Sequence, residues 1–317
     1  MNTIVVGSLH TDLVSSGLAK FPDIGENVYA QNLSISAGGK SRNIAEMIAK
    51  LTPNNSVAMV SRTVRDPYNL WGVPLKALNE SGVNTEFVKI ASTSKNQLPG
   101  IAFIPVDRGG NNLIFISKGA SADFSPDDID AASDLFEQVG RNRGMLVATL
   151  ESPVETLSQA FMLAEQNKIK IMLDPGGAEK INDVTKILDS KIYLIKPNAY
   201  ETKMLTGVDV VDLQSAKKAG RIFSQTGIEN TLITAGRNGA YLICESIQKH
   251  LPIKELSNQT EKDETGCGDQ VMATLSALIQ QGKTLETAAE IAITAGTKQF
   301  YRSGIVPLTF RELANLS

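Results

Sequence analysis

Short, unbroken runs of apolar and β-branched residues alternate along this chain with amphipathic stretches. A strand that is buried on both faces has this kind of unbroken apolar run, so the runs predict a largely parallel sheet. The amphipathic stretches predict helices that pack on both faces of the sheet. The predicted strands are Ile4–Gly7, Val57–Val60, Gly144–Ala148, Lys170–Leu173, Lys191–Ile195 and Thr231–Thr234, and the helices between them include Ser41–Leu51, Leu70–Glu80, Pro153–Asn167 and Leu213–Gln225.

Two stretches depart from this rhythm. Asn27–Ser36 alternates polar and apolar residues with period two, as expected of a half-exposed strand. Gly100–Pro105 and Asn112–Ser117 flank a turn that contains two glycines, and they predict a β-hairpin. We expect these strands to form a small lid beside the main sheet, from segments at approximately 13–37 and 95–119.

The rest of the chain fits a single domain spanning residues 1–317, and it ends in three predicted helices. Hydrophobic residues make up 42% and charged residues 21% of the 317, as in a globular protein with a real core. The formal net charge of −3 shows no excess of positive charge that would attract a polyanion, so we expect no nucleic-acid partner. The predicted terminal helices are Gly266–Gln281, Leu285–Tyr301 and Thr309–Asn315.

Cysteine content and hydropathy indicate the compartment. The two cysteines, Cys244 and Cys267, form no metal-type pair and suit a reducing environment. No stretch approaches about 18 consecutive apolar residues, and the N-terminus lacks the basic start and long apolar run of a signal peptide. We therefore expect a cytoplasmic protein without a membrane partner.

The heptapeptide Asp263–Asp269 is the most informative stretch for function. Gly266 and Gly268 bracket Cys267, so successive N–H groups can point at one spot, and the helix that follows adds its positive dipole end. Asp269 would lie in the first helical turn, next to a bound anion. This arrangement suits phosphoryl transfer, in which a base takes a hydroxyl proton while N–H groups stabilise the moving charge. A purely structural helix cap is the alternative.

The loop Ala37–Ser41 precedes another predicted helix. A P-loop would need glycine at position 34, where this chain has serine, so that interpretation is disfavoured. Gly38 and Gly39 would still allow close approach of a ligand, and Lys40 and Asn43 would offer polar groups to it. The alternative is the first turn of a surface helix.

Acidic residues follow two of the predicted strands, at the edge where open α/β sheets bind ligands. Asp12 could accept hydrogen bonds from vicinal hydroxyls, with His10 beside it, or it could cap a turn. Glu151, which precedes Pro153, could bind a hydroxyl or face water.

Two later motifs have both local and functional explanations. Asn198 and Glu201 have the spacing of a capping box, but they could also orient water around Mg²⁺ and a triphosphate. Thr234 ends a strand and opens a predicted hairpin to Ala240–Cys244. In that turn Gly236 and Gly239 would let a nucleotide lie close to the backbone.

Taken together, these motifs resemble those of the ribokinase-like carbohydrate kinases, the PfkB family, in the same order and over nearly the whole chain. Gly38-Gly39-Lys40 with Asn43 resembles the N-terminal substrate signature, and Asp263–Asp269 resembles the C-terminal one. The resemblance implies a ribokinase-like three-layer α/β sandwich with a mostly parallel central sheet and a small β lid.

The resemblance also implies an ATP- and Mg²⁺-dependent kinase that transfers the γ-phosphoryl group to a sugar hydroxyl. Asp269 would be the general base, and Gly266, Cys267 and Gly268 would supply the anion hole. Acceptor hydroxyls would be held by His10, Asp12, Gly38, Gly39, Lys40, Asn43 and Glu151; the nucleotide by Asn198, Thr234, Gly236 and Gly239; Mg²⁺, through water, by Glu201; and an activating monovalent cation, K⁺, by Asp263 and Thr265.

Departures from the family pattern leave the acceptor open. His10 stands where ribokinases usually carry asparagine, and Ser41-Arg42 stand where they usually carry Gly-Ala, which adds charge near the acceptor. A nucleoside such as pseudouridine is therefore an alternative to a pentose, and a catalytically idle binding relative is a third possibility. The apolar faces of the lid strands also suggest a homodimer formed through the lid.

Overall fold

The computed structural model describes residues 1–53, 56–92, 97–177, 187–188, 190–254 and 262–316. Within these ranges the larger sheet has nine strands in the order β13-β12-β11-β10-β9-β8-β1-β4-β5. Neighbouring strands from β11 to β5 run parallel, whereas β12 is antiparallel to β11 and β13. The strands are β1 (Thr3–Val6), β4 (Val57–Val64), β5 (Val88–Ala91), β8 (Met145–Thr149), β9 (Lys170–Asp174), β10 (Ile192–Ile195), β11 (Asn230–Thr234), β12 (Ala240–Cys244) and β13 (Gln248–Leu251).

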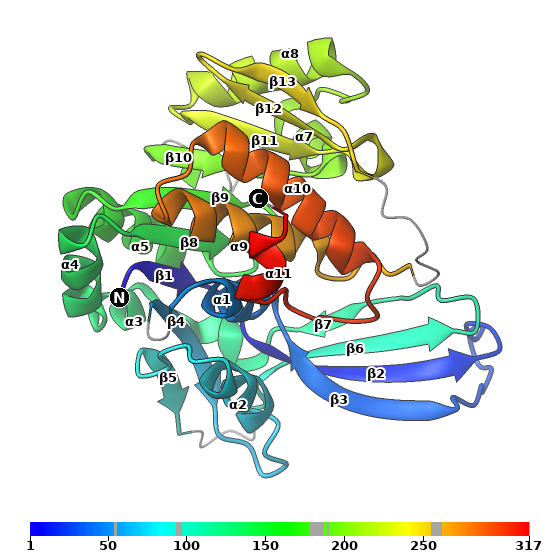
Figure 1. Cartoon of the computed structure of the whole chain (residues 1–317). Helices are drawn as coiled ribbons and strands as arrows, with labels where there is room; N and C mark the ends of the chain where they lie inside the picture. Colours follow the sequence, from blue (N-terminus) through cyan, green and yellow to red (C-terminus); the bar gives the residue numbers. More distant parts are fainter. Residues whose placement is uncertain (54–55, 93–96, 178–186, 189, 255–261, 317) are drawn as a thin grey trace.

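Helices cover both faces of this sheet and make a three-layer sandwich (Figure 1). Successive side chains of a strand point to opposite faces, so Val5 of β1 joins the core on one face while Ile4 and Val6 join the core on the other. The first face carries α1 (Lys40–Leu51), α2 (Gly72–Glu80), α9 (Cys267–Gln280), α10 (Leu285–Phe300) and α11 (Phe310–Ala314); the second carries α3 (Pro126–Asp130), α4 (Ser133–Arg141), α5 (Val154–Gln166), α7 (Ala199–Thr206) and α8 (Leu213–Gln225).

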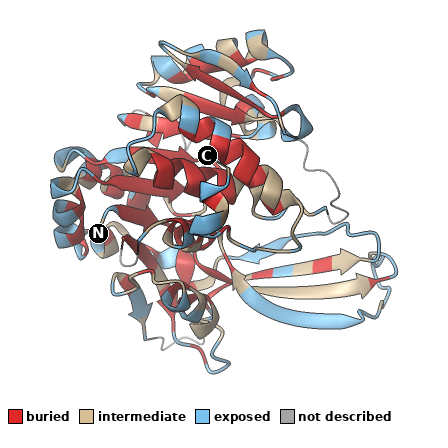
Figure 2. Cartoon of the chain, in the orientation of Figure 1, coloured by how far each residue is buried: buried red, intermediate tan, exposed pale blue. Residues whose placement is uncertain are grey.

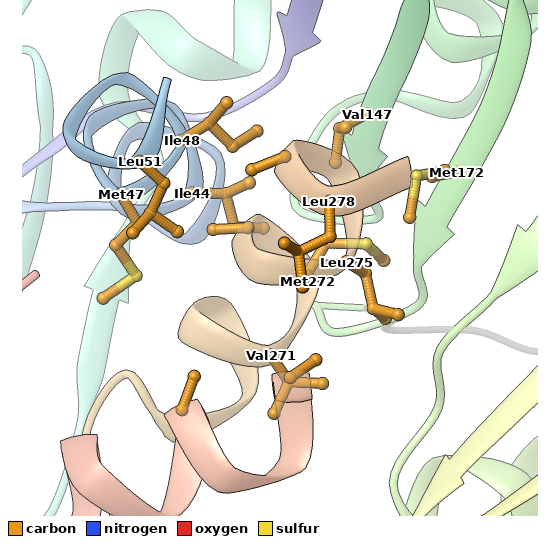
Figure 3. Close-up of a cluster of buried hydrophobic side chains, with 14 of the residues drawn as sticks. Ile44, Met47, Ile48, Leu51, Val147, Met172, Val271, Met272, Leu275 and Leu278 are labelled. Carbon is orange, nitrogen blue, oxygen red and sulfur yellow. The ribbon is translucent and has the colours of Figure 1, made fainter. Parts of the chain in front are cut away.

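The core on the first face fixes two helices relative to one another. Ile44 and Ile48 of α1 and Met272 and Leu275 of α9 are fully buried in one cluster (Figure 3). Because α1 and α9 start at the carboxyl edge of the sheet, this packing also fixes what lies in their first turns.

A second, smaller sheet extends from the body of the molecule, and its strands are much more exposed than those of the main sheet (Figure 2). This lid sheet has the order β3-β2-β6-β7, with β2 and β6 parallel and the outer pairs antiparallel. Its strands are β2 (His10–Leu18), β3 (Asn32–Gly38), β6 (Gly100–Asp107) and β7 (Phe115–Ser117). The hairpin predicted between positions 100 and 117 is confirmed; residues 95–96 of the expected lid lie outside the described ranges.

Strand β2 corrects one expectation. Asp12 follows the first strand, as expected, but where the sequence allowed a turn it lies within β2, paired with Ser36 of β3 and Ala102 of β6. The sequence of β2 mixes polar and apolar residues without clear alternation, and two neighbouring strands hold it in place. The strand predicted over Asn27–Ser36 likewise begins only at Asn32.

Candidate active site

The loop predicted to bind an anion does form the N-terminus of α9. Gly266 adopts a left-handed conformation with φ of 74°, and a Cβ at this position would lie 2.6 Å from Ile305 Cδ1. The N–H groups of Gly268 and Asp269 donate to no acceptor among the described residues, while the Cys267 N–H makes a long bond of 3.3 Å to the Glu264 carbonyl. The N–H groups of Gly268 and Asp269 therefore remain available to an anion.

Asp269 connects the two predicted signatures. It is 4% exposed, and its Oδ1 lies 2.9 Å from Lys40 Nζ. Its Oδ2 accepts a 2.9 Å hydrogen bond from Asn43 Nδ2. The first turns of α1 and α9 thus meet at one carboxylate, and that carboxylate lies beside the unpaired N–H groups of its own helix.

Two charged residues that sequence reasoning missed complete this cluster. Lys196 and Asp174 are 3% and 1% exposed, and Lys196 Nζ lies 2.8 Å from Asp174 Oδ2, with Lys40 Nζ at 4.0 Å from the same oxygen. A Cβ on Gly268 would lie only 3.2 Å from Lys196 Nζ, so this ammonium group borders the N-terminus of α9. The available signal was position, since Asp174 ends β9 and Lys196 follows β10 at the ligand-binding edge.

The charge state of Lys40 follows from its neighbours. Burial by itself lowers the pKa of the Lys40 ammonium group, but the carboxylates of Asp174 and Asp269 outweigh it and hold that pKa well above its ordinary value. Lys40 therefore stays a cation and carries its positive charge at the site.

Glu151 joins the glycine pair to the main sheet. Its Oε2 accepts a 2.9 Å hydrogen bond from the Lys40 backbone N–H and another from the Ser8 hydroxyl. Gly177, with φ of +93°, would overlap Glu151 if it carried a Cβ. Glu151 is therefore placed next to Lys40, and its expected role in holding an acceptor hydroxyl stays a prediction.

Asp12 and His10 are two residues apart in β2 and so lie on the same side of the strand, where Asp12 faces Gly38 and His10 faces Gly100. A Cβ on Gly38 would overlap the Asp12 carboxylate, so glycine is required there for steric reasons. Burial raises the pKa of Asp12 to about 6, and the nearby Arg42 guanidinium only partly offsets that rise. His10 is 4% exposed, burial lowers its pKa, and its Nε2 has no hydrogen-bond partner among the described residues.

Arg42 does not present an open charge to the acceptor. It is 2% exposed, pairs with Glu46, and donates to the Ala37 carbonyl at 2.6 Å. It also donates to Asn43 Oδ1, which turns the Asn43 amide so that its Nδ2 faces Asp269. Arg42 thus supports Asn43, a role that the sequence did not reveal.

Two residues expected at the nucleotide site, Asn198 and Glu201, form the predicted capping box at the start of α7. Asn198 Oδ1 accepts from the Glu201 N–H at 2.7 Å, and Glu201 Oε2 accepts from the Asn198 N–H at 2.8 Å, which is a capping box. Burial and the charge of Asp174 raise the pKa of Glu201, which places its carboxyl near the charged cluster. One carboxylate acting through water suits Mg²⁺, so Glu201 fits its expected role, which stays a prediction.

The turn after β11 contains two glycines in different surroundings: a side chain would have free space at Gly236 but not at Gly239. Gly236 has φ of +54°, and a Cβ there would meet nothing within 4 Å. Gly239 has φ of +80°, and a Cβ there would overlap the Leu251 carbonyl, so its glycine has a local reason. Thr234 donates its N–H to the Pro197 carbonyl at 2.9 Å, which fixes this turn beside the capping box.

Comparison with known proteins identifies the family. The family model described as "pfkB family carbohydrate kinase" matches residues 2–306. The chain belongs to the pfkB family of carbohydrate kinases. Among curated relatives, a ribokinase from Haemophilus influenzae is 33% identical over 239 residues, covering 75% of this chain and 73% of the relative. A deoxyribokinase from Salmonella typhimurium is 29% identical over 294 residues, covering 92% and 90%.

Solved structures confirm the ribokinase-like fold of this pfkB kinase. The Arabidopsis thaliana ribokinase, in a structure described as complexed with ribose and ATP, matches with a TM-score of 0.86 at 24% identity, covering 99% of this chain and 98% of that one. The Thermotoga maritima ribokinase matches with a TM-score of 0.82 at 23% identity, covering 100% and 99%. Within the described ranges, every helix is too short or too polar to span a bilayer.

The residues expected to hold K⁺ in this pfkB kinase are engaged by protein donors. Asp263 Oδ1 accepts from the Thr265 N–H at 2.9 Å, and Oδ2 accepts from the Gly304 N–H at 2.8 Å. The Thr265 carbonyl accepts from Gln299 Nε2 at 3.2 Å. The part of the chain that the structure describes contains no group of three or more His, Cys, Asp or Glu side chains arranged to hold a metal. Because the Asp263 carboxylate and the Thr265 carbonyl already accept these hydrogen bonds, their oxygens do not fit a site for a monovalent cation.

Proposed function

We propose that this pfkB kinase transfers the γ-phosphoryl group of ATP to a hydroxyl of a free sugar, most simply a pentose. The observation that carries the proposal is the position of Asp269, which lies beside the unpaired N–H groups of Gly268 and Asp269 itself and between Lys40 and Asn43. A carboxylate and an anion cradle at one helix terminus supply what phosphoryl transfer needs. The similarity to ribokinases and a deoxyribokinase supports a pentose acceptor.

In this proposal Asp269 takes the proton of the acceptor hydroxyl. Asp269 accepts one hydrogen bond from Lys40 and one from Asn43, and the incoming hydroxyl replaces one of these two donors. The N–H groups of Gly266, Cys267 and Gly268 form the anion hole, and the unpaired Asp269 N–H lies next to them. The transferring phosphoryl displaces the long bond from the Cys267 N–H to the Glu264 carbonyl. Lys196 lies beside this cradle and adds positive charge where negative charge develops.

The nucleotide side rests on the turn after β11 and on the capping box. In this proposal Asn198, Thr234, Gly236 and Gly239 would line the nucleotide, and Glu201 would hold Mg²⁺ through water. When bound, Mg²⁺ neutralises charge on the β- and γ-phosphates.

The acceptor pocket is formed by Asp12, Glu151, Gly38, Gly39 and His10. The Asp12 carboxylate makes no hydrogen bond to the described residues, so both of its oxygens can accept from vicinal hydroxyls. Because Arg42 is neutralised by Glu46, the pocket offers little to an acceptor that already carries a phosphate. This favours a free sugar.

A nucleoside acceptor is the second candidate, and one observation favours it. The buried Nε2 of His10 has no partner among the described residues and could pair with a polar group of a base. An idle binding relative is less favoured, since a binder has no use for a buried base beside an anion cradle.

An acceptor panel tests the proposal. Ribose, 2-deoxyribose, several hexoses, uridine and pseudouridine are incubated with ATP and Mg²⁺, and ADP release is measured. Asp269→Asn should lower kcat by roughly 10²-fold or more, the usual value of general-base help, whereas Glu264→Gln in the same loop should change it little. Near-normal turnover by Asp269→Asn would refute its role as the base. ATP binding by calorimetry without consumption on any acceptor would indicate an idle relative.

We also propose that the lid sheet closes over the acceptor and pairs with a second copy of the chain. Ile35, Leu13, Phe103 and Phe115 are register partners across its four strands and so lie on one face. Ile35, Phe103 and Phe115 are 53%, 43% and 58% exposed, which is an unusual apolar surface for a monomer. Sedimentation of the wild type and of Ile35→Glu should give a dimer and a monomer, respectively. A wild-type monomer at all concentrations would contradict this pairing.

A further inference from the structure

Gln299 joins two loops next to the active site. It lies near the end of α10, is 0% exposed, and its Nε2 donates to two backbone carbonyls, Thr265 O at 3.2 Å and Gly304 O at 2.6 Å. Thr265 belongs to the loop that leads into α9, and Gly304 belongs to the loop that follows α10. One side-chain amide therefore connects the segment before the anion cradle to the segment after α10.

The same two loops are also joined by Asp263. Its carboxylate accepts from the backbone N–H groups of Thr265 and Gly304 at 2.9 and 2.8 Å, and its own N–H donates to the Phe300 carbonyl at 2.8 Å. Carboxylate and carbonyl oxygens are the ligands of hard cations. Here these oxygens already receive hydrogen bonds from N–H donors of the protein.

A cation could enter only by displacing the Gln299 amide. Its NH₂ group presents partial positive charge to the Thr265 and Gly304 carbonyls, which is the task a cation would perform. Moving this amide aside without a new partner would leave buried polar atoms unsatisfied. The amide also lies close to the helix start, because a Cβ on Gly266 would be 3.8 Å from Gln299 Nε2.

We propose that Gln299 takes the place of the monovalent cation that the family resemblance implied, so that phosphoryl transfer by this kinase does not depend on K⁺. Gln299 touches neither acceptor nor nucleotide. It is a positioning residue that holds the loop before Gly266 and thereby aims the N–H groups at the start of α9. The inference rests on the proposed function, since it concerns the geometry of that anion hole.

The alternative is a Gln299 side-chain amide that is flipped, so that Oε1 and Nε2 exchange places. Gln299 Oε1 has no hydrogen-bond partner among the described residues. A flipped amide would bring Oε1 against two carbonyl oxygens, which is repulsive unless a cation lies between them. A cation effect on the wild-type protein is therefore the result that would overturn the inference.

The experiment compares the full-length protein in KCl, NaCl and tetramethylammonium chloride at equal ionic strength. For the wild type, kcat/KM should agree within about twofold and Tm within about 1 °C among the three salts, because a ligand that binds the native state would raise Tm. A K⁺-dependent rise in either quantity would overturn the inference. If no acceptor is phosphorylated, the proposed function fails, but the Tm comparison still tests this inference.

Two variants and a control extend the test. Gln299→Ala should lose roughly ten- to hundredfold in kcat/KM in tetramethylammonium, the scale of small misplacements of catalytic groups, and should regain part of it in KCl. Gln299→Glu places a carboxylate against the two carbonyls and should gain Tm in KCl. Gln280→Ala is the control, because Gln280 Nε2 donates to the Asn2 carbonyl at 2.7 Å at the other end of α9. Variants that fold but respond equally to all three salts would count against the inference.

Discussion

Replacing Asp12 by asparagine should stabilise the ligand-free protein while it destroys acceptor binding. Asp12 is partly buried on β2, and its carboxylate makes no hydrogen bond to the described residues. Its pKa is raised from 3.8 to about 6, chiefly by burial. Ionising a partly buried carboxylate without hydrogen-bond donors costs free energy in the ligand-free protein. The ionised form is useful only when a ligand supplies those donors. Asparagine has the same shape without the charge.

The magnitude follows from the pKa of Asp12 in the folded and unfolded chain. A rise from 3.8 to about 6 corresponds to about 3 kcal/mol, at 1.36 kcal/mol per pH unit. The folded state binds the proton more tightly, so this carboxyl reduces stability as pH rises from about 4 to 6, and the loss is complete above that window. The gain from Asp12→Asn should therefore be up to about 3 kcal/mol at pH 8 and about half of that at pH 5.

Urea denaturation of the wild type and Asp12→Asn at pH 8 and pH 5 measures this gain. The control is Asp23→Asn, since the Asp23 side chain is 92% exposed and its replacement should change the free energy of unfolding by no more than about 0.5 kcal/mol at either pH. The acceptor KM of Asp12→Asn should rise sharply at the same time. A variant that is less stable than the wild type at pH 8, or whose advantage is the same at both pH values, would refute the reasoning.

Three further substitutions or modifications test other parts of the site. Gly38→Ala places a methyl group on the Asp12 carboxylate and should raise the acceptor KM by roughly tenfold or more with little change in the KM for ATP, as measured by steady-state kinetics. Arg42→Ala leaves Glu46 without its buried partner and should cost about 3–5 kcal/mol in urea denaturation, with a smaller loss when Glu46→Ala is added. Burial raises the pKa of Cys267 to about 12, so in a Cys244→Ser background its alkylation at pH 8 should be about a thousandfold slower than in urea; equal rates would contradict this burial.

The main sheet could be predicted because its strands are buried on both faces. Runs such as Val57–Val60 and Thr231–Thr234 have no polar interruption, so their pattern alone predicts strands, and each forms part of an observed strand. Strand β2 could not be predicted in this way. Its position depends on β3 and β6, which pair with it from distant parts of the sequence.

The site was predictable where a residue type carries its own chemistry in a local motif. Asp269, Lys40 and Asn43 were expected from two signatures, and the structure brings them into contact. Lys196 and Asp174 were missed because a lysine and an aspartate at strand ends have no distinctive local pattern. Their significance depends on the burial and charge pairing that the fold creates.

The hydrogen bonds that assemble the site connect positions that are far apart in the sequence. Lys40 and Asp269 are 229 positions apart, Asn43 and Asp269 are 226 apart, and Ser8 and Glu151 are 143 apart. Contacts of such long range form slowly, because large loops must close before they form. Enzymatic turnover should therefore return only in the last phase of refolding, and a nascent chain that still lacks α9 should have no phosphotransfer activity.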